Sequence, residues 1–109
     1  MPHLDHAYLK DIIFLLGAEQ FVSLKDQFIK DCEKAATLLK MAIAQGDDAQ
    51  VRKQAHMLKG VLAQYGARRG EAMAARLVND LPSDWREQTQ ALIDEAVLAC
   101  KEMASLAGA

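Results

Sequence analysis

The sequence predicts an all-α protein, an up-and-down antiparallel four-helix bundle with a short additional helix at the N-terminus. Apolar residues make up 51% of the 109 residues but aromatic ones only 6%, and strong helix formers are abundant. Apolar residues also recur at intervals of three or four along most of the chain. The glycines and prolines that interrupt this pattern leave short connections, which favour antiparallel neighbours.

The first two helices are separated by a glycine. The first is expected over residues 5–16 and ends at Gly17. The second is expected over residues 19–45 and ends at Gly46. Its apolar positions are Phe21, Leu24, Phe28, Cys32, Ala35, Leu39 and Ala42.

The last three helices each have a recognisable start or stop. Asp47 or Asp48 can cap the third, and Gly66 closes it. The fourth is expected over residues 67–80, before Pro82, and the fifth begins at Trp85. The third helix has apolar residues at Val51, Ala55, Leu58, Leu62 and Tyr65. The fourth helix has them at Met73, Leu77 and Val78. The predicted inner positions of the fifth helix are Trp85, Thr89, Leu92, Ala96, Ala99, Met103 and Leu106.

Length and charge narrow the class of protein. The chain has the size of one domain, expected over residues 1–109, and its formal net charge is −2. It therefore lacks the basic field that binds a nucleic-acid backbone. The longest apolar stretch, residues 12–18, is too short for a membrane span, and charges at the N-terminus do not fit a signal peptide. We expect a soluble, cytoplasmic protein.

Cysteine, methionine and the N-terminal histidines predict no cofactor site. Cys32 and Cys100 fall on apolar faces, so buried free thiols are expected rather than a disulfide. No metal site is predicted at His3 and His6, because Pro2 lacks the backbone N–H that an amino-terminal copper site needs, and no other spacing suits zinc or di-iron. The remaining methionines with core-like spacing are Met41, Met73 and Met103.

His56 is the exception to the pattern of the third helix. At about 100° per residue, it lies roughly 140° from the centre of the apolar stripe and faces away from the core. Its neighbours on the helix surface are Arg52, Lys53 and Lys59, followed by Gly60 and, one turn on, Ala63. Glycine inside a helix costs about 1 kcal/mol relative to alanine, yet the stripe keeps its phase beyond Gly60. A missing side chain there would leave space beside the ring for another molecule.

The segment AHMLKGVLAQYGA, residues 55–67, resembles the signature of histidine-containing phosphotransfer (HPt) domains, and the resemblance extends along the chain through LDHAYLKDII and AIAQGD. It implies that His56 is phosphorylated, that Lys59 stabilises the phosphoryl charge and that Gly60 provides clearance. The family most often has small residues where this chain has Val61 and Leu62. Leu62 points to the core on the wheel, whereas Val61 could narrow the choice of partner.

The resemblance also implies partners and a mechanism. A ring nitrogen would attack a phospho-aspartate on a receiver domain, which would supply Mg²⁺ and aspartates, so the chain needs no cofactor of its own. Receiver domains of response regulators and a hybrid sensor kinase are the expected partners, and a monomer is expected. Docking candidates are Arg52, Lys53, Ala63, Gln27, Asp31, Ile12 and Ile13. For the last four, ordinary core and solvated roles fit equally well.

Two other functions share features with this sequence. Histidine kinase dimerisation helices also carry an outward histidine, but resemblance to them would require an acidic residue next and a proline shortly beyond; here Met57 follows. No nucleotide-binding glycine loop or catalytic set is apparent either, which indicates a phosphocarrier rather than an independent enzyme. The main alternative is a helical adaptor that binds signalling partners without phosphoryl transfer, in which His56 would be dispensable.

Overall fold

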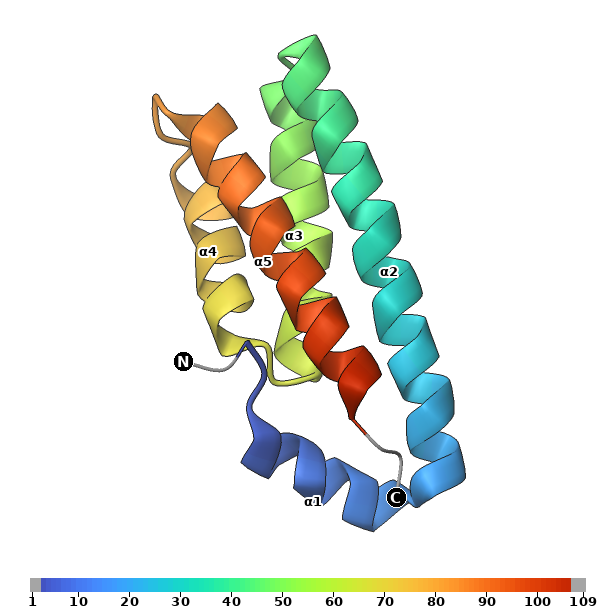
Figure 1. Cartoon of the computed structure of the whole chain (residues 1–109). Helices are drawn as coiled ribbons and strands as arrows, with labels where there is room; N and C mark the ends of the chain where they lie inside the picture. The colour runs from blue at the N-terminus through green and yellow to red at the C-terminus, as the bar shows by residue number, and fades with distance from the viewer. Residues whose placement is uncertain (1–2, 107–109) are drawn as a thin grey trace.

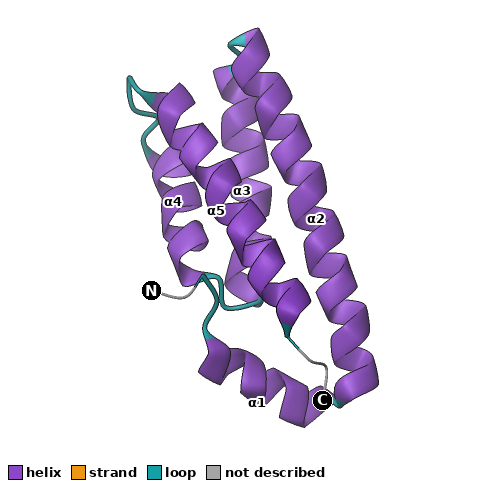
Figure 2. Cartoon of the chain, in the orientation of Figure 1, coloured by secondary structure: helices purple, strands orange, loops and turns teal. Residues whose placement is uncertain are grey.

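The computed structural model describes residues 3–106 and contains five helices and no strand within that range. The helices are α1 (His6–Leu16), α2 (Ala18–Gln45), α3 (Asp48–Gln64), α4 (Arg68–Asn79) and α5 (Trp85–Ser105). The loops between them are short, as the teal segments of Figure 2 show. All five predicted helices are therefore present, with boundaries shifted by about one residue.

Helices α2 to α5 form the antiparallel bundle, and α1 lies across one end of it (Figure 1). In the bundle, α2 packs against α3 and α5, and α4 packs against the same two helices. The only bundle helix that α1 contacts extensively, among the described residues, is α2. The molecule is elongated, measuring 43 × 21 × 18 Å. The predicted fold class is confirmed.

The helix boundaries have local causes. Asp5 caps α1, where its carboxylate accepts a hydrogen bond from the Tyr8 amide at 3.1 Å, and Asp47 caps α3 in the same way from Gln50. Between α2 and α3 the chain reverses at Gly46, whose φ of 66° is left-handed and suits glycine. The short turn at Gly46 places α3 directly alongside α2.

The core contains side chains from all five helices and confirms the apolar stripe of α3. Val51, Ala55, Leu58, Leu62 and Tyr65 are all buried. Met41, by contrast, was expected at a core-like position but is 51% exposed. Its immediate neighbours in the stripe, Leu39 and Ala42, are buried, and Met41 lies about 100° around the helix from Ala42. The prediction of a core-like position for Met41 was therefore wrong.

Two histidines, His3 just before α1 and His6 at its first position, attach this end of the chain to α5. The His3 ring lies 2.7 Å from Glu95 and the His6 ring 2.8 Å from Glu102, while Glu102 also accepts hydrogen bonds from the backbone amides of His3 and Leu4. Leu4 is buried below this cluster. His3 and His6 thus have structural partners, which the sequence pattern did not predict.

No helix in residues 3–106 has the length and apolar character needed to cross a membrane. Nor does this part of the chain gather three histidine, cysteine or carboxylate side chains in a way that would hold a metal ion.

Candidate functional site

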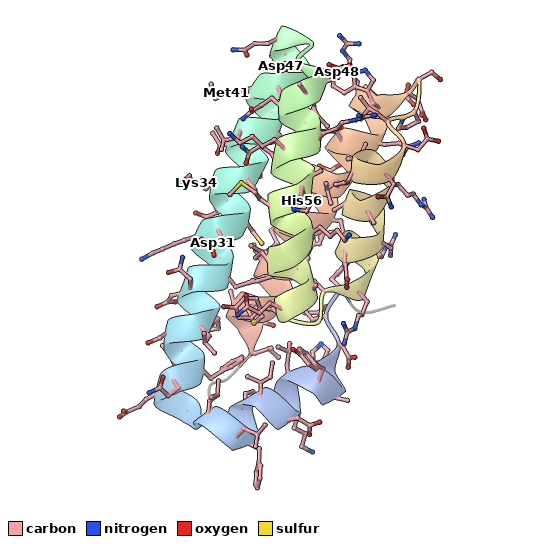
Figure 3. All side chains as sticks on the ribbon, turned by 180° about the vertical axis from the view of Figure 1, so that it is seen from behind. Asp31, Lys34, Met41, Asp47, Asp48 and His56 are labelled. Atoms are coloured by element: carbon pink, nitrogen blue, oxygen red, sulfur yellow. The ribbon has the colours of Figure 1, made fainter. Side chains whose placement is uncertain are left out.

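His56 lies near the middle of α3 with its side chain exposed to solvent. Its orientation follows from the core stripe, because the flanking residues Ala55 and Leu58 are fully buried and turn the intervening ring outward. Seen from behind the view of Figure 1, His56 lies on the open face of α3 beside α2 (Figure 3). The wheel prediction for His56 is confirmed, and an imidazole in this position can act as a nucleophile toward an incoming group.

Gly60 leaves a bare surface one turn after His56. The helix continues unbroken through Gly60 to Gln64, so the glycine does not end it. A Cβ atom built at Gly60 would meet nothing within 4 Å outside its own helix backbone. Among residues 3–106, no packing contact therefore demands glycine here.

Gly66 and Gly70 provide a contrast. Gly66 has a φ of 75°, and a Cβ there would lie 2.8 Å from Cδ2 of Tyr8; at Gly70 it would lie 2.9 Å from Cδ1 of Leu62. Those two glycines are required by close contacts within the fold. Gly60 differs from both, because no described atom outside its own helix backbone would touch a side chain started there.

Three cationic residues surround His56 on the helix surface. Arg52 and Lys53 are exposed one turn before it, and Lys59 is half-buried one turn after it. The ion pairs found between residues 3 and 106 involve none of these three. Their charges are therefore available to an anionic group brought to His56.

A groove of about 470 Å³ runs between α2 and α3, and His56 is not among the residues that line it, although its neighbours Lys53 and Met57 are. Asp31 and Lys34 line it from α2, and Lys53, Met57 and Val61 line it from α3. Figure 3 shows His56 at a height between those of Lys34 and Asp31. The groove brings together charges of both signs, apolar side chains such as Leu58 and Val61, and the buried polar Gln54, a composition suited to a transient protein contact.

The predicted docking residues are only partly brought together. Asp31 and Lys53 share the groove, and Gln27 donates a hydrogen bond to Asp31 at 2.8 Å. Ala63 is half-exposed two turns after His56. Ile12 and Ile13 are half-buried against the core on α1 and do not line this groove.

Sequence reasoning missed several residues of this surface. Met57 follows His56, is 56% exposed and lines the groove, as Lys34 does from α2. The wheel of α3 would have placed Met57 outside the core stripe, whereas Lys34 could be found only once the pairing of α2 with α3 was known. Gln54 lines the groove and is buried. Its burial was not predicted, because a polar side chain is normally expected at the surface.

A family model described as the Hpt domain matches residues 23–108, which is most of the chain and includes His56, Lys59 and Gly60. The match begins within α2, so α1 lies outside it. Searches of curated proteins and of solved structures found no match.

Proposed function

Because the chain belongs to the Hpt domain family, we propose that it is a phosphocarrier in which His56 receives and passes on the phosphoryl group. Hpt domains serve phosphotransfer in two-component signalling, interact with receiver domains and have no independent catalysis. The observation that supports His56 as the carrier is its exposed ring beside the bare surface of Gly60. His56 is also the only described histidine on the bundle flank, since His3 and His6 are engaged with α5.

In the proposed reaction, the lone pair of a neutral imidazole nitrogen attacks the phosphorus of a receiver's phospho-aspartate. A nitrogen–phosphorus bond forms as the acyl phosphate's P–O bond breaks, and the aspartate leaves as a carboxylate. Lys59 stabilises charge on the phosphoryl oxygens, and Gly60 admits the partner's active site. The partner's own aspartates hold Mg²⁺. Transfer to a second receiver, or back to the first, reverses these bond changes.

The proposal extends to the partners and the setting. Arg52, Lys53, Ala63, Gln27 and Asp31 would contact the docked receiver, and Ile12 and Ile13 would contribute only if the partner also reaches α1. We propose a monomer, comprising a single domain over residues 1–109, that works in the cytoplasm. Its partners would be response-regulator receiver domains and a hybrid sensor kinase.

Incubation with a phosphorylated receiver domain tests the proposal. Label should pass to the wild-type protein, be labile in acid and be absent from His56→Gln. His6→Gln is the matched control. In the wild-type protein His6 is engaged by Glu102 at 2.8 Å and is not the proposed carrier, so the His6→Gln variant should still take up label. Equal labelling of His56→Gln would refute the carrier role, and a receiver that binds without labelling any histidine would favour the adaptor function.

A further inference from the structure

The two cysteines meet where α2 packs against α5, although 68 positions separate them in the chain. Cys32 on α2 is 1% exposed, and Cys100 on α5 is half-buried. Both line one groove of about 530 Å³ between the two helices, together with Glu33, Lys40 and Lys101. Small solutes can therefore reach Cys100 from solvent, while Cys32 lies behind it.

The two thiols also interact directly. The pKa of Cys100 is lowered, because a hydrogen bond with Cys32 outweighs the opposing effects of burial and of Glu33. The same hydrogen bond, reinforced by burial, raises the pKa of Cys32. The accessible sulfur is therefore the more acidic one, and thiolate is the form that reacts with oxidants. This division suits an attacking thiol with a buried resolving partner.

We propose that Cys100 and Cys32 form a reversible redox site that reacts with peroxides and closes a disulfide between α5 and α2. The Cys100 thiolate attacks a peroxide oxygen; the O–O bond breaks, Cys100 becomes a sulfenic acid, and the other oxygen leaves as water after protonation. The Cys32 thiol then attacks the Cys100 sulfur: an S–S bond forms as the S–O bond breaks, and the proton of Cys32 leaves with the hydroxyl as a second water. The two thiols lose two electrons and two protons in total, and hydrogen peroxide is reduced to two waters.

This site is independent of the proposed phosphocarrier function. Helix α5 is nearest the viewer in Figure 1, whereas the exposed face of His56 is seen from behind in Figure 3. A disulfide between α2 and α5 would leave the α2–α3 groove uncovered. Its main effect is expected on stability, because the cross-link joins distant parts of the chain and restricts the unfolded state.

The test exposes the folded, reduced protein to hydrogen peroxide, followed by alkylation under denaturing conditions and mass measurement. Wild type should lose two hydrogens and both alkylatable thiols, remain a single chain without reductant, and regain both thiols with dithiothreitol. Its melting temperature should rise by on the order of 10 °C on oxidation.

Single variants separate the roles of the two sulfurs. In Cys32→Ser, dimedone should trap a sulfenic acid at Cys100 and no internal disulfide should form. In Cys100→Ser, the buried Cys32 should react at least tenfold more slowly than Cys100 does in Cys32→Ser. Cys100→Ala provides the same comparison if serine perturbs the fold, which circular dichroism will show.

Three results would overturn the proposal. The first is retention of both thiols in folded wild type at peroxide levels that oxidise free cysteine. The second is oxidation mainly to dimers linked between molecules. The third is equal reactivity of Cys32 and Cys100 in the single variants. None of these depends on whether His56 carries phosphate.

Discussion

At the scale of single residues, Gly60 lowers the stability of α3 without any packing contact that requires it. Replacement by alanine adds a Cβ that meets nothing within 4 Å and improves helix propensity. We predict that Gly60→Ala raises the free energy of unfolding by about 0.5–1 kcal/mol, measured by urea denaturation. A loss of stability would mean that glycine is needed by the fold itself.

A longer side chain at the same position tests the proposed clearance. Gly60→Gln should remain as helical as Gly60→Ala but fill the space beside His56. We expect phosphoryl transfer from a receiver to slow by roughly tenfold or more, because small displacements of reacting groups are costly. Rapid-quench measurement of label on His56 provides the rate; equal rates for the two variants would remove clearance as the purpose of Gly60.

Lys59 offers a test of charge stabilisation. It is half-buried one turn after His56 and forms none of the ion pairs in the described part of the chain. We predict that Lys59→Ala slows transfer by roughly tenfold to a hundredfold without abolishing it. Lys101→Ala, an exposed lysine on α5, is the matched control and should transfer at the wild-type rate. A wild-type rate for Lys59→Ala would exclude Lys59 from the site.

At the scale of helices, the attachment of α1 depends on α5 and on the turn after α3. The backbone amide of Asp5 donates to the carbonyl of Gly66 at 2.8 Å, and Tyr8 donates its hydroxyl to the carbonyl of Gln64 at 3.0 Å. None of these contacts is local in sequence. The periodicity of each helix predicted α1 itself, but it contained no information about where α1 would dock.

Gly66→Ala tests the junction between α1 and α3. The residue has a φ of 75°, and its new Cβ would lie 2.8 Å from Tyr8 and 3.2 Å from Cβ of Asp5. We expect the free energy of unfolding to fall by about 1–3 kcal/mol, opposite in sign to Gly60→Ala. Urea denaturation of both variants under one condition makes the comparison. An unchanged free energy of unfolding for Gly66→Ala would show that the junction can rearrange to accept the new Cβ atom.

Glu102 makes the attachment of α1 sensitive to acid. Burial alone would raise its pKa, but hydrogen bonds from the backbone amides of His3 and Leu4 and from the His6 ring together lower it. A lowered pKa means that the ionised form stabilises the fold above the ordinary glutamate pKa, near 4.3, and that this contribution is lost as the pH falls through the lowered value. Stability and α1 attachment should therefore both weaken in acid.

The measurement compares Glu102→Gln with wild type by urea denaturation between pH 7 and pH 3. The variant should be less stable at pH 7, and the difference should shrink once the pH falls below about 4. Glu87→Gln, an exposed glutamate in the first turn of α5, controls for general charge effects and should show a smaller difference. A constant gap between Glu102→Gln and wild type across the range would contradict the role of ionisation.

At the scale of the whole molecule, the fold class and the outward direction of His56 were predictable because both depend on helical periodicity. The contacts between different helices were not predictable from this periodicity. The groove that joins Asp31 to Lys53 and the meeting of Cys32 with Cys100 require knowledge of which faces pair. The prediction that Cys32 is buried is confirmed. The same prediction for Cys100 was only partly right, because Cys100 borders the groove and not the centre of the bundle and is half-buried.

The exposed apolar residues of α1 bear on whether the protein associates with itself. Phe14 is 87% exposed and Leu15 is 78% exposed on α1. Two such side chains offer only a few hundred Å² of apolar surface, well below the roughly 800 Å² per partner typical of stable interfaces. Light scattering at micromolar concentration should therefore report a monomer. A dimer that Phe14→Ser dissociates would instead identify α1 as its interface.

The position of His56 on the flank of an elongated bundle has a kinetic consequence for the proposed carrier. A single ring on one side of the rod can be approached by only one globular partner at a time. A phosphorylated donor must depart before an acceptor arrives, so relay through this chain should follow double-displacement kinetics. An excess of either partner in its unreactive state would then occupy His56 and competitively inhibit phosphoryl transfer to or from the other partner.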